Sequence, residues 1–349
     1  MVYTFNPLQD SRWQNFVDRH PQGSVFHGAG WLEALSRTYG YEPIVYSTSP
    51  PSGELTNGVV LCRVNSWLTG RRLVSLPFTD HCEPLVQDAG DRMRVLRALA
   101  AEVDGNSSRS RLKYVELRPL CANAWDDPAA DRSESFAFHV LDLRPALDDI
   151  YGRIHKSTHQ RKILRAERES LSYEAGSSDV LLTKFYHLLL LTRRRHQLPP
   201  QPIQWFRNLI ACMGDQLTIR IASKDGEPLA AILTLTYRDT MTYKYGCSDA
   251  RHHSLGAVPF VLWKAVQEGK ALGMNQLDLG RSDRDNEGLI TFKDRWGAER
   301  SQLTYVRYSR ARASQTTDHR RSRVLRQAFA RLPDSMLVAA GKLLYRHMG

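Results

Sequence analysis

The sequence has few cysteines and no long apolar run. The longest apolar runs, such as residues 188–191 and 337–340, fall far short of the roughly 20 residues that cross a bilayer. The first ten residues lack a basic start followed by an apolar stretch, so we expect no secretory signal and a cytoplasmic protein. The five cysteines form no Cys-x-x-Cys pair, which predicts a reducing compartment and no zinc knuckle; they are Cys62, Cys82, Cys121, Cys212 and Cys247.

Length and composition indicate a folded chain of about two domains. The chain has 349 residues, 42% of them hydrophobic and 24% charged, which is typical of globular proteins and argues against disorder. At about 150 residues a domain, this length favours two domains. Lysine and arginine number 48 against 37 aspartate and glutamate, a formal net charge of +11. That excess favours polyanionic partners such as RNA, acidic lipid headgroups or phosphorylated substrates, and does not choose among them.

Two stretches about half a chain apart have similar patterns and predict a duplication. Trp31 and Gly53 in the first stretch correspond to Trp205 and Gly226 in the second, with almost the same spacing. Each stretch predicts a helix, a strand, a Gly-Glu turn, further strands rich in β-branched and aromatic residues, and then another helix and strand. Chance similarity between two strand-rich halves is the alternative. The pattern favours a duplicated α+β unit.

Basic segments follow each predicted unit. Residues 150–168 predict one helix rich in cations. Residues 177–179, Ser-Ser-Asp, offer N-caps for a second helix that ends at residues 193–195 before a Pro-Pro pair. The tail, residues 310–349, is basic and can pack on the core or lie on an anionic membrane surface. Its apolar stripe consists of Val324, Leu325, Ala328, Phe329 and Leu332.

The densest functional pattern is a strand that ends in Gly280-Arg281-Ser282, followed by a short helix with Lys293. Backbone amides and a hydroxyl at such a strand end can face a ligand. The lysine ammonium could stabilise charge on an acyl oxygen, an effect worth about 3 kcal/mol per donor, or hold a phosphate. A solvated helix lysine is the alternative. Asp278 could act in catalysis or simply pair with a nearby arginine.

The ordered set of motifs resembles the FemAB-like proteins, which are tandem GNAT-fold acyltransferases that include the aminoacyl-tRNA-dependent enzymes of peptidoglycan cross-bridge synthesis. The resemblance covers residues 10–310 and is closest to the bacterial branch associated with exopolysaccharide or protein-sorting gene clusters. An early tryptophan and Ser75-Leu-Pro-Phe in the first half also fit. The residues that match are Arg161, Ile163 and Ala166 in the connector, Asp278 and Gly280 at the strand end, and Phe292, Lys293 and Gly297 in the short helix and after it.

The resemblance implies two GNAT-like domains, each a mixed, mostly antiparallel sheet flanked by helices. We place them at residues 1–148 and 149–309, followed by the tail. It implies catalytic roles for Lys293 and Asp278. It also implies that Arg161 contacts acceptor or donor phosphate and that Gly280 and Arg281 line the acyl-transfer channel. We further expect Ser282, Phe292 and Tyr245 to bind substrate.

The implied reaction is acyl transfer by direct attack of an amine or hydroxyl of a cell-envelope or polysaccharide precursor. No tightly bound cofactor is implied; the co-substrate is aminoacyl-tRNA or acyl-coenzyme A. Two departures leave the donor open. No long coiled-coil insertion is visible, and residues 251–257 have the ingredients of the coenzyme A pattern Arg/Gln-x-x-Gly-x-Gly/Ala at a different spacing.

Other patterns favour simpler interpretations. His252 and His253 lack a carboxylate at ligand spacing, so we expect no metal site. Cys247 with His252 could form a nucleophile pair, but a buried strand cysteine is the better interpretation. No Gly-x-Ser-x-Gly elbow is present. A different class of function is a non-catalytic protein that binds RNA or another anionic polymer on the same duplicated fold.

Overall fold

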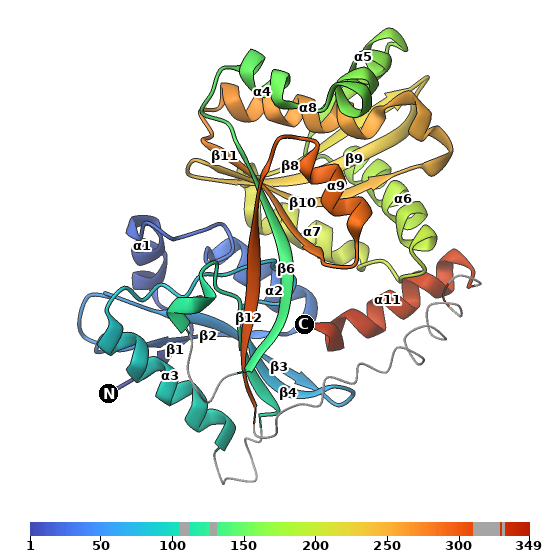
Figure 1. Cartoon of the computed structure of the whole chain (residues 1–349). Coiled ribbons are helices and arrows are strands. Elements are labelled where there is room, and N and C mark those ends of the chain that lie inside the picture. Colours follow the sequence, from blue (N-terminus) through green and yellow to red (C-terminus); the bar gives the residue numbers. More distant parts are fainter. Residues whose placement is uncertain (105–111, 126–130, 310–328, 330–331) are drawn as a thin grey trace. The chain divides into compact units, whose positions relative to one another are not determined.

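The computed structural model describes residues 1–104, 112–125, 131–309, 329 and 332–349 (Figure 1). Contacts within the chain define two compact units. Unit 1 comprises residues 1–136, 302–317 and 342–349, and unit 2 comprises residues 137–301 and 318–341. These units are discontinuous in sequence, whereas the domains expected from the sequence are linear.

Unit 1 follows the order strand, two helices, three strands, helix, strand. Its elements are β1 (Tyr3–Phe5), α1 (Ser11–Arg19), α2 (Ala29–Tyr39), β2 (Glu42–Ser47), β3 (Val59–Ser66), β4 (Gly70–Val74), α3 (Ala89–Asp104), β5 (Tyr114–Leu117) and the short helix η1 (Ala122–Trp125), after which β6 (Asp131–Asp142) leads into unit 2. Its sheet has the order β1-β2-β3-β4-β5-β12 and is antiparallel except for the β4–β5 pair.

Unit 2 repeats that order after a connector of short helices. The connector consists of α4 (Leu147–Arg153), η2 (Lys156–Gln160) and α5 (Arg161–Arg168). The repeated elements are β7 (Ser172–Gly176), α6 (Asp179–Arg195), α7 (Ile203–Met213), η3 (Gly214–Gln216), β8 (Leu217–Lys224), β9 (Glu227–Tyr237), β10 (Thr240–Ser248), η4 (Ala250–Leu255), α8 (Ala257–Ala271), β11 (Gln276–Asp283), α9 (Glu287–Asp294) and β12 (Glu299–Ser309). Strands β7 to β10 pair antiparallel, and β10 pairs parallel with β11.

The duplication predicted from the sequence is confirmed. Trp31 on α2 and Trp205 on α7 are both fully buried, and each unit has one parallel strand pair at the same place in its element order. The last strand of each copy is exchanged: β12 pairs with β5 in unit 1, and β6 lies next to β11 in the strand order of unit 2. A mixed, mostly antiparallel sheet with helices around it therefore describes each unit.

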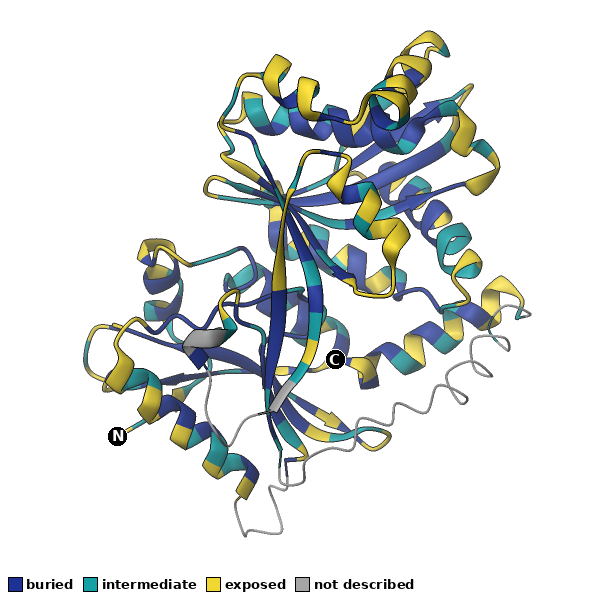
Figure 2. Cartoon of the chain, in the orientation of Figure 1, coloured by how far each residue is buried: buried dark blue, intermediate teal, exposed yellow. Residues whose placement is uncertain are grey.

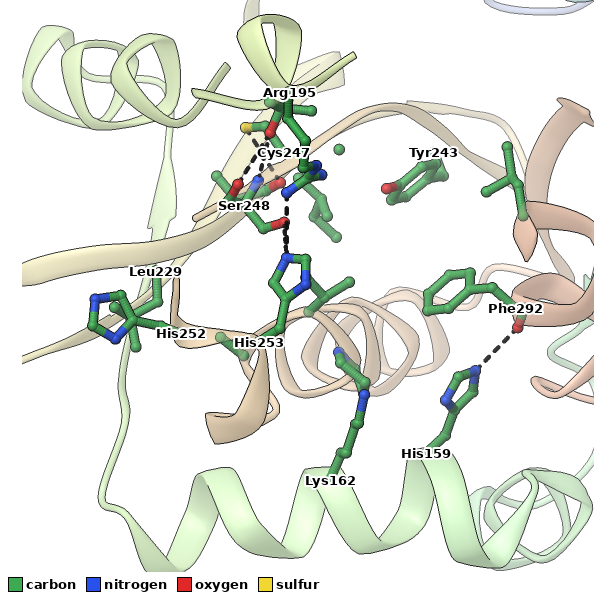
Figure 3. Close-up of a pocket in the computed structure, with 18 of the residues that line it drawn as sticks. His159, Lys162, Arg195, Leu229, Tyr243, Cys247, Ser248, His252, His253 and Phe292 are labelled. Atoms are coloured by element: carbon green, nitrogen blue, oxygen red, sulfur yellow. Dashed lines mark hydrogen bonds between the residues drawn. The ribbon is translucent and has the colours of Figure 1, made fainter. Parts of the chain in front are cut away.

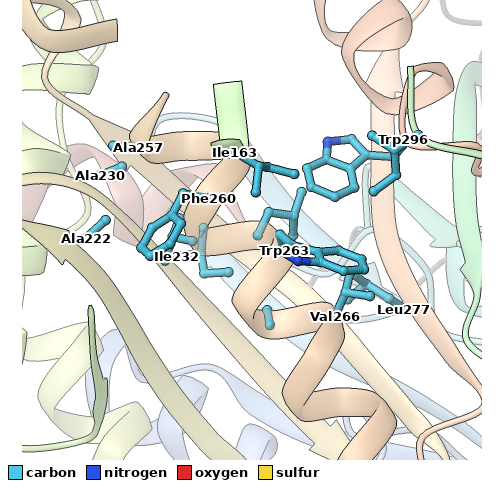
Figure 4. Packing of buried hydrophobic residues seen from close by; sticks show 14 of the residues in the cluster. Ile163, Ala222, Ala230, Ile232, Ala257, Phe260, Trp263, Val266, Leu277 and Trp296 are labelled. Carbon is cyan, nitrogen blue, oxygen red and sulfur yellow. The ribbon is translucent and has the colours of Figure 1, made fainter. Parts of the chain in front are cut away.

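The core of unit 2 lies between α8 and the sheet. Phe260, Trp263 and Val266 of α8 project from a helix whose apolar residues recur at helical spacing, and they pack with Leu277 of β11 and with Ile163 of α5 (Figure 4). The strands of this unit are largely buried, while the outer face of α5 is exposed (Figure 2). Helix α5 therefore packs on the core through one apolar face, and its cations lie on the opposite, exposed face.

The single basic helix expected over residues 150–168 is wrong. Alpha helix α4 ends at Arg153, Ile154 is extended, and η2 is a π-turn that leads into α5. The His155 amide donates to the Arg295 carbonyl at 2.9 Å, and the Gln160 side chain donates to the carbonyls of Tyr151 and Ile154. These tertiary hydrogen bonds outweigh the helical preference of the segment. Of the three N-caps expected at residues 177–179, Ser178 caps α6 by accepting from the Leu181 amide.

The tail is described from residue 332, apart from residue 329. The stripe positions Val324, Leu325 and Ala328 lie outside the described residues. Helix α11 (Asp334–Met348) buries Leu337 and Tyr345, so its inner face packs on the protein. None of the described helices is long and apolar enough to span a membrane.

Candidate functional site

The parallel strands β10 and β11 separate after a short ladder. Residues 240–242 pair with residues 276–278, although β10 continues to Ser248 and β11 to Asp283. A β-bulge at Lys244 interrupts the pairing of β10 with β9, because Tyr243 pairs with Thr234 and Tyr245 with Leu233. Ligands bind in open α/β sheets at the carboxyl ends of parallel strands. The separation therefore marks a place where a ligand can bind between the two strands.

A cavity of about 320 Å³ lies within unit 2 beside this separation (Figure 3). Its apolar groups come mainly from β9, β10, the first turn of α8 and Phe292 of α9. Most of its polar groups come from η2, α5, the end of α6 and η4. This size lies within the range of small-molecule sites, about 300–1,000 Å³.

The amino end of α8 faces the cavity. Gly256 caps the helix with φ of +80°, and Ala257, Val258 and Pro259 of its first turn line the cavity. The first backbone N–H groups of a helix have no partner within the helix and carry partial positive charge. A helix start that faces a cavity is a binding site for phosphate or carboxylate.

Cationic and neutral nitrogen groups surround the same cavity. Lys162 of α5 and Arg195 of α6 line it together with His159, His196, His252 and His253. Among the described residues that line the cavity, none carries a carboxylate. The charge of the lining therefore complements an anion, which reinforces the effect of the helix start.

Three of the lining histidines, His159, His196 and His253, have a pKa below the usual value, so they are neutral near pH 7. Burial, reinforced by Arg195 and Lys162, lowers the pKa of His253 below its usual value, and the ring Nε2 lies 2.9 Å from the Ser248 hydroxyl. Burial also lowers the pKa of His159. Because His159 Nε2 donates to the Phe292 carbonyl at 3.0 Å, its Nδ1 is an acceptor, and it has no hydrogen-bond partner among the described residues. The Nδ1 of His159 is buried, so of these two rings it is the exposed His253 that a ligand in the cavity can reach.

The residues expected at the end of β11 do come together. Gly280 has φ of +71°, and its amide donates to Asp278 Oδ1 at 2.7 Å. Lys293 is buried, and its Nζ donates to the carbonyls of Gly280 and Arg281, each at 2.9 Å. Ser282 is buried, and its hydroxyl has no partner among the described residues. These residues do not line the cavity, whereas Phe292, which precedes Lys293, does.

At two other expected positions, a nearby residue lines the cavity in place of the expected one. Arg161 is exposed, and Lys162 lines the cavity instead. Tyr245 accepts a hydrogen bond from Trp205 Nε1 at 2.8 Å and packs on Phe206, whereas Tyr243 lines the cavity. The bulge at Lys244 explains this difference, because an extra residue turns the side chains before and after it to opposite faces.

Several groups at the cavity were not identified from the sequence as site residues. His159 and Lys162 are three positions apart and so share one helix face, which is a signal that the sequence does contain. Arg195 comes from a helix that no local pattern connects with η2 or α5. Its place depends on the tertiary fold.

Neither Cys247 nor the acidic groups beside His252 offer the chemistry of a nucleophile or a ready metal site. The Cys247 thiol is buried, donates to the carbonyls of Phe185 and Ala231, and has a pKa raised by burial. Glu227, Asp249 and His252 lie close enough to hold a metal ion. However, the Arg251 guanidinium forms ion pairs with both carboxylates, so a metal ion would have to displace it.

Comparison with known families identifies this unit. Residues 154–294 match the family model of the acetyltransferase (GNAT) domain. Residues 154–294 form a GNAT-type acyltransferase domain. The matched segment includes α5, β10, α8 and α9, and therefore every element that lines the cavity. Comparison with curated proteins finds no match.

Solved structures with the same fold include proteins of the FemAB-like and tandem GNAT types. The crystal structure of FemX has a TM-score of 0.66 at 12% identity, over 94% of this chain and 100% of that one. A tandem GNAT protein of the clavulanic acid biosynthesis pathway has a TM-score of 0.56 at 12% identity, over 90% and 99%. The C-terminal domain of a putative lysylphosphatidylglycerol synthetase from Agrobacterium fabrum has a TM-score of 0.56 at 13% identity, over 87% and 92%. These similarities confirm the tandem GNAT fold.

The loop before α8 is closer to the coenzyme A pattern than we expected from the sequence. Counted from Arg251, the segment that ends at Gly256 has the length of the pattern, with Ser254 in place of the first glycine. The expected difference in spacing is therefore wrong, and the departure is one substitution. The glycine that remains is the one that caps α8.

We predict that Gly256→Ala destabilises the protein more than Gly273→Ala. Both glycines have positive φ, but a Cβ at Gly256 would lie 2.2 Å from the Lys162 carbonyl oxygen, whereas one at Gly273 would meet nothing within 4 Å. The backbone conformation alone costs about 1–2 kcal/mol, and the clash adds about 1–3 kcal/mol. Urea unfolding of the two variants measures the difference. Equal losses would show that the contact between the cap and α5 is not tight.

Proposed function

We propose that the cavity of unit 2 binds the phosphate-bearing part of an activated acyl donor, and that the acyl group passes directly to an amine or hydroxyl of a cell-envelope or polysaccharide precursor. One observation carries the proposal: the start of α8 faces a cavity that Lys162 and Arg195 line without any carboxylate among its described residues. Two independent sources of positive potential thus act on one volume.

Two donors share the required chemistry. Coenzyme A thioesters and aminoacyl-tRNA both carry phosphate groups and an activated carbonyl. The loop from Arg251 to Gly256 favours coenzyme A. The net charge of +11 and the exposed cations of α5 favour the longer polyanion; those cations are Arg161, Arg165 and Arg168. We therefore propose a binding site for the phosphate that both donors carry, and the experiments below identify the donor.

The proposed reaction is a direct attack without an enzyme-bound intermediate. The nucleophile forms a bond to the donor carbonyl carbon, and its proton passes to the neutral ring of His253. The donor C–S or C–O bond then breaks, and the leaving sulfur or oxygen takes up that proton from the ring. The backbone of β10 leaves its ladder at the Lys244 bulge, where amide groups can stabilise the oxyanion. Cys247 is a poor nucleophile because burial raises its pKa.

We propose that the end of β11 supports this reaction. Lys293 brings a buried positive charge to the carbonyls of Gly280 and Arg281, and its neighbour Phe292 forms part of the cavity wall. Asp278 and Ser282 occupy the same strand. The family resemblance gives Lys293 and Asp278 catalytic roles, and the hydrogen bonds of Lys293 favour an action through the position and charge of this strand end.

A cell-envelope acceptor is the least constrained part of the proposal. It rests on the resemblance to FemAB-like proteins and on the same fold in FemX and in a putative lysylphosphatidylglycerol synthetase domain. Acceptor pools separated by class, namely amino sugars, lipid headgroups and peptide amines, can be tested once the donor is known.

We predict that Lys162→Ala weakens donor binding by about 10- to 100-fold, because one charge-assisted hydrogen bond to phosphate is lost. The protein is incubated in turn with acetyl-coenzyme A, a longer acyl-coenzyme A and charged tRNA, and donor consumption is followed by mass spectrometry. Affinity is then measured for the donor consumed. Lys156→Ala is the control, because Lys156 is an exposed lysine of the same connector that does not line the cavity.

Arg161→Ala distinguishes the two donors. With tRNA, affinity should fall steeply with salt, and this variant should flatten the slope. With coenzyme A, it should behave like Lys156→Ala. Equal affinities of wild type and Lys162→Ala would contradict the phosphate site, and RNA binding without consumption of any donor would favour the non-catalytic binder.

We predict that Lys293→Ala lowers turnover by about 100-fold. It should also reduce the free energy of unfolding by about 1–3 kcal/mol, since two carbonyls lose a buried donor. Lys270→Ala is the matched control, because Lys270 also donates to a backbone carbonyl, that of Arg144, but at the surface. Turnover measured well below the unfolding temperature separates the two effects. Unchanged turnover in a folded Lys293→Ala protein would exclude a role in the reaction.

A further inference from the structure

The hairpin between β3 and β4 exposes a tryptophan and a leucine in unit 1. Trp67 is 81% exposed and Leu68 53%, and they follow Ser66, which pairs with Gly70 where the hairpin closes. The six other tryptophans of the chain, all within the described residues, are buried. Exposure of the largest apolar side chain at a projecting tip gives no folding advantage, so it points to a binding role.

The end of α11 holds this hairpin and adds apolar groups. The Ser66 hydroxyl lies 3.0 Å from His347 Nδ1, the Thr69 hydroxyl donates to the His347 carbonyl at 3.0 Å, and the His347 ring packs against the edge of Trp67. Leu343 and Met348 of the same helix end are 63% and 57% exposed. The hairpin tip and the helix end are thus tied together by hydrogen bonds within unit 1.

The exposed charges in these segments are all positive. Arg71, next to the hairpin tip, is exposed, as are Lys342 and Arg346 on α11. Residues 65–72 and 335–349 contain no aspartate or glutamate. We call Trp67, Leu68, Leu343, Met348 and these three cations the Trp67 surface.

We propose that the Trp67 surface docks on an anionic lipid bilayer. Tryptophan prefers the interface between headgroups and acyl chains, because its ring is apolar and its N–H finds polar partners there. Cations beside it gain from the negative potential of an anionic leaflet. An exposed hairpin tip can bind a bilayer because a bilayer needs no complementary groove. The three exposed cations of these two segments fit an anionic surface. The proposal is independent of the donor bound in unit 2.

Sedimentation with vesicles tests the proposal. The full chain is mixed with vesicles of phosphatidylcholine alone or with phosphatidylglycerol added, and the bound fraction is measured against lipid concentration. We expect binding to the anionic vesicles that falls with salt. The double variant Trp67→Ser, Leu68→Ser should bind about tenfold or more weakly, since insertion depends on apolar area. Lys342→Ala and Arg346→Ala should each lose about fivefold.

Two further variants test whether binding depends on the Trp67 surface itself. Trp67→Tyr retains an amphipathic ring and should restore most of the binding, and Leu272→Ser removes an equally exposed leucine, 62%, from unit 2 and should change nothing. The substituted side chains are exposed, so thermal unfolding should match that of wild type. Absence of binding to anionic vesicles, or binding that survives the double variant, would overturn the proposal. So would a change of oligomeric state in the double variant without any vesicle binding, which would assign the surface to a protein contact.

Discussion

The separation of β10 from β11 is the constraint on which the site in unit 2 depends. Parallel strands that part leave backbone groups without their ladder partners, and such groups must find others when they are buried. Lys293 supplies that need for the carbonyls of Gly280 and Arg281, and Asp278 supplies it for the Gly280 amide. Lys293 thus binds two carbonyls at the end of β11, beyond the residues that pair with β10, and the cavity lies beside the continuing strand β10.

The first copy shows what happens when this space is filled. Its parallel pair, β4 and β5, also has a three-residue ladder, 72–74 with 114–116. There, however, the Cys82 amide donates to the Arg118 carbonyl, and the Arg118 guanidinium donates to the carbonyls of Leu76 and Thr79. The loop that follows β4 therefore packs along β5. The two copies thus differ at this point. In unit 1 the loop after β4 continues along β5, whereas in unit 2 a cavity lies where β10 and β11 separate.

The sequence predicted the repeated elements because hydrophobic spacing and turn residues are local. It also predicted that Asp278, Gly280, Arg281 and Lys293 lie together, because they share one strand end and the helix that follows it. It could not predict that Lys293 is buried, since no local pattern shows that the β11 carbonyls need a donor.

Three other errors have physical causes that lie outside any single segment. The bulge at Lys244 exchanges Tyr245 for Tyr243 in the cavity wall. Hydrogen bonds from His155 and Gln160 break the expected connector helix and bring His159 and Lys162 to the cavity. Arg195 joins them from α6, which only the tertiary fold brings near. The proposed anion site is thus assembled from segments that are far apart in the sequence, and no local pattern predicts that they lie together.

Hydrogen exchange measured by mass spectrometry tests the central claim most directly. The full chain is compared alone, with desulfo-coenzyme A, and with tRNA whose amino acid is attached by a non-reactive amide. The account predicts that one of these ligands slows exchange at the start of α8, residues 256–261, and in residues 156–165. Protection that spares both segments, although the ligand binds, would contradict it.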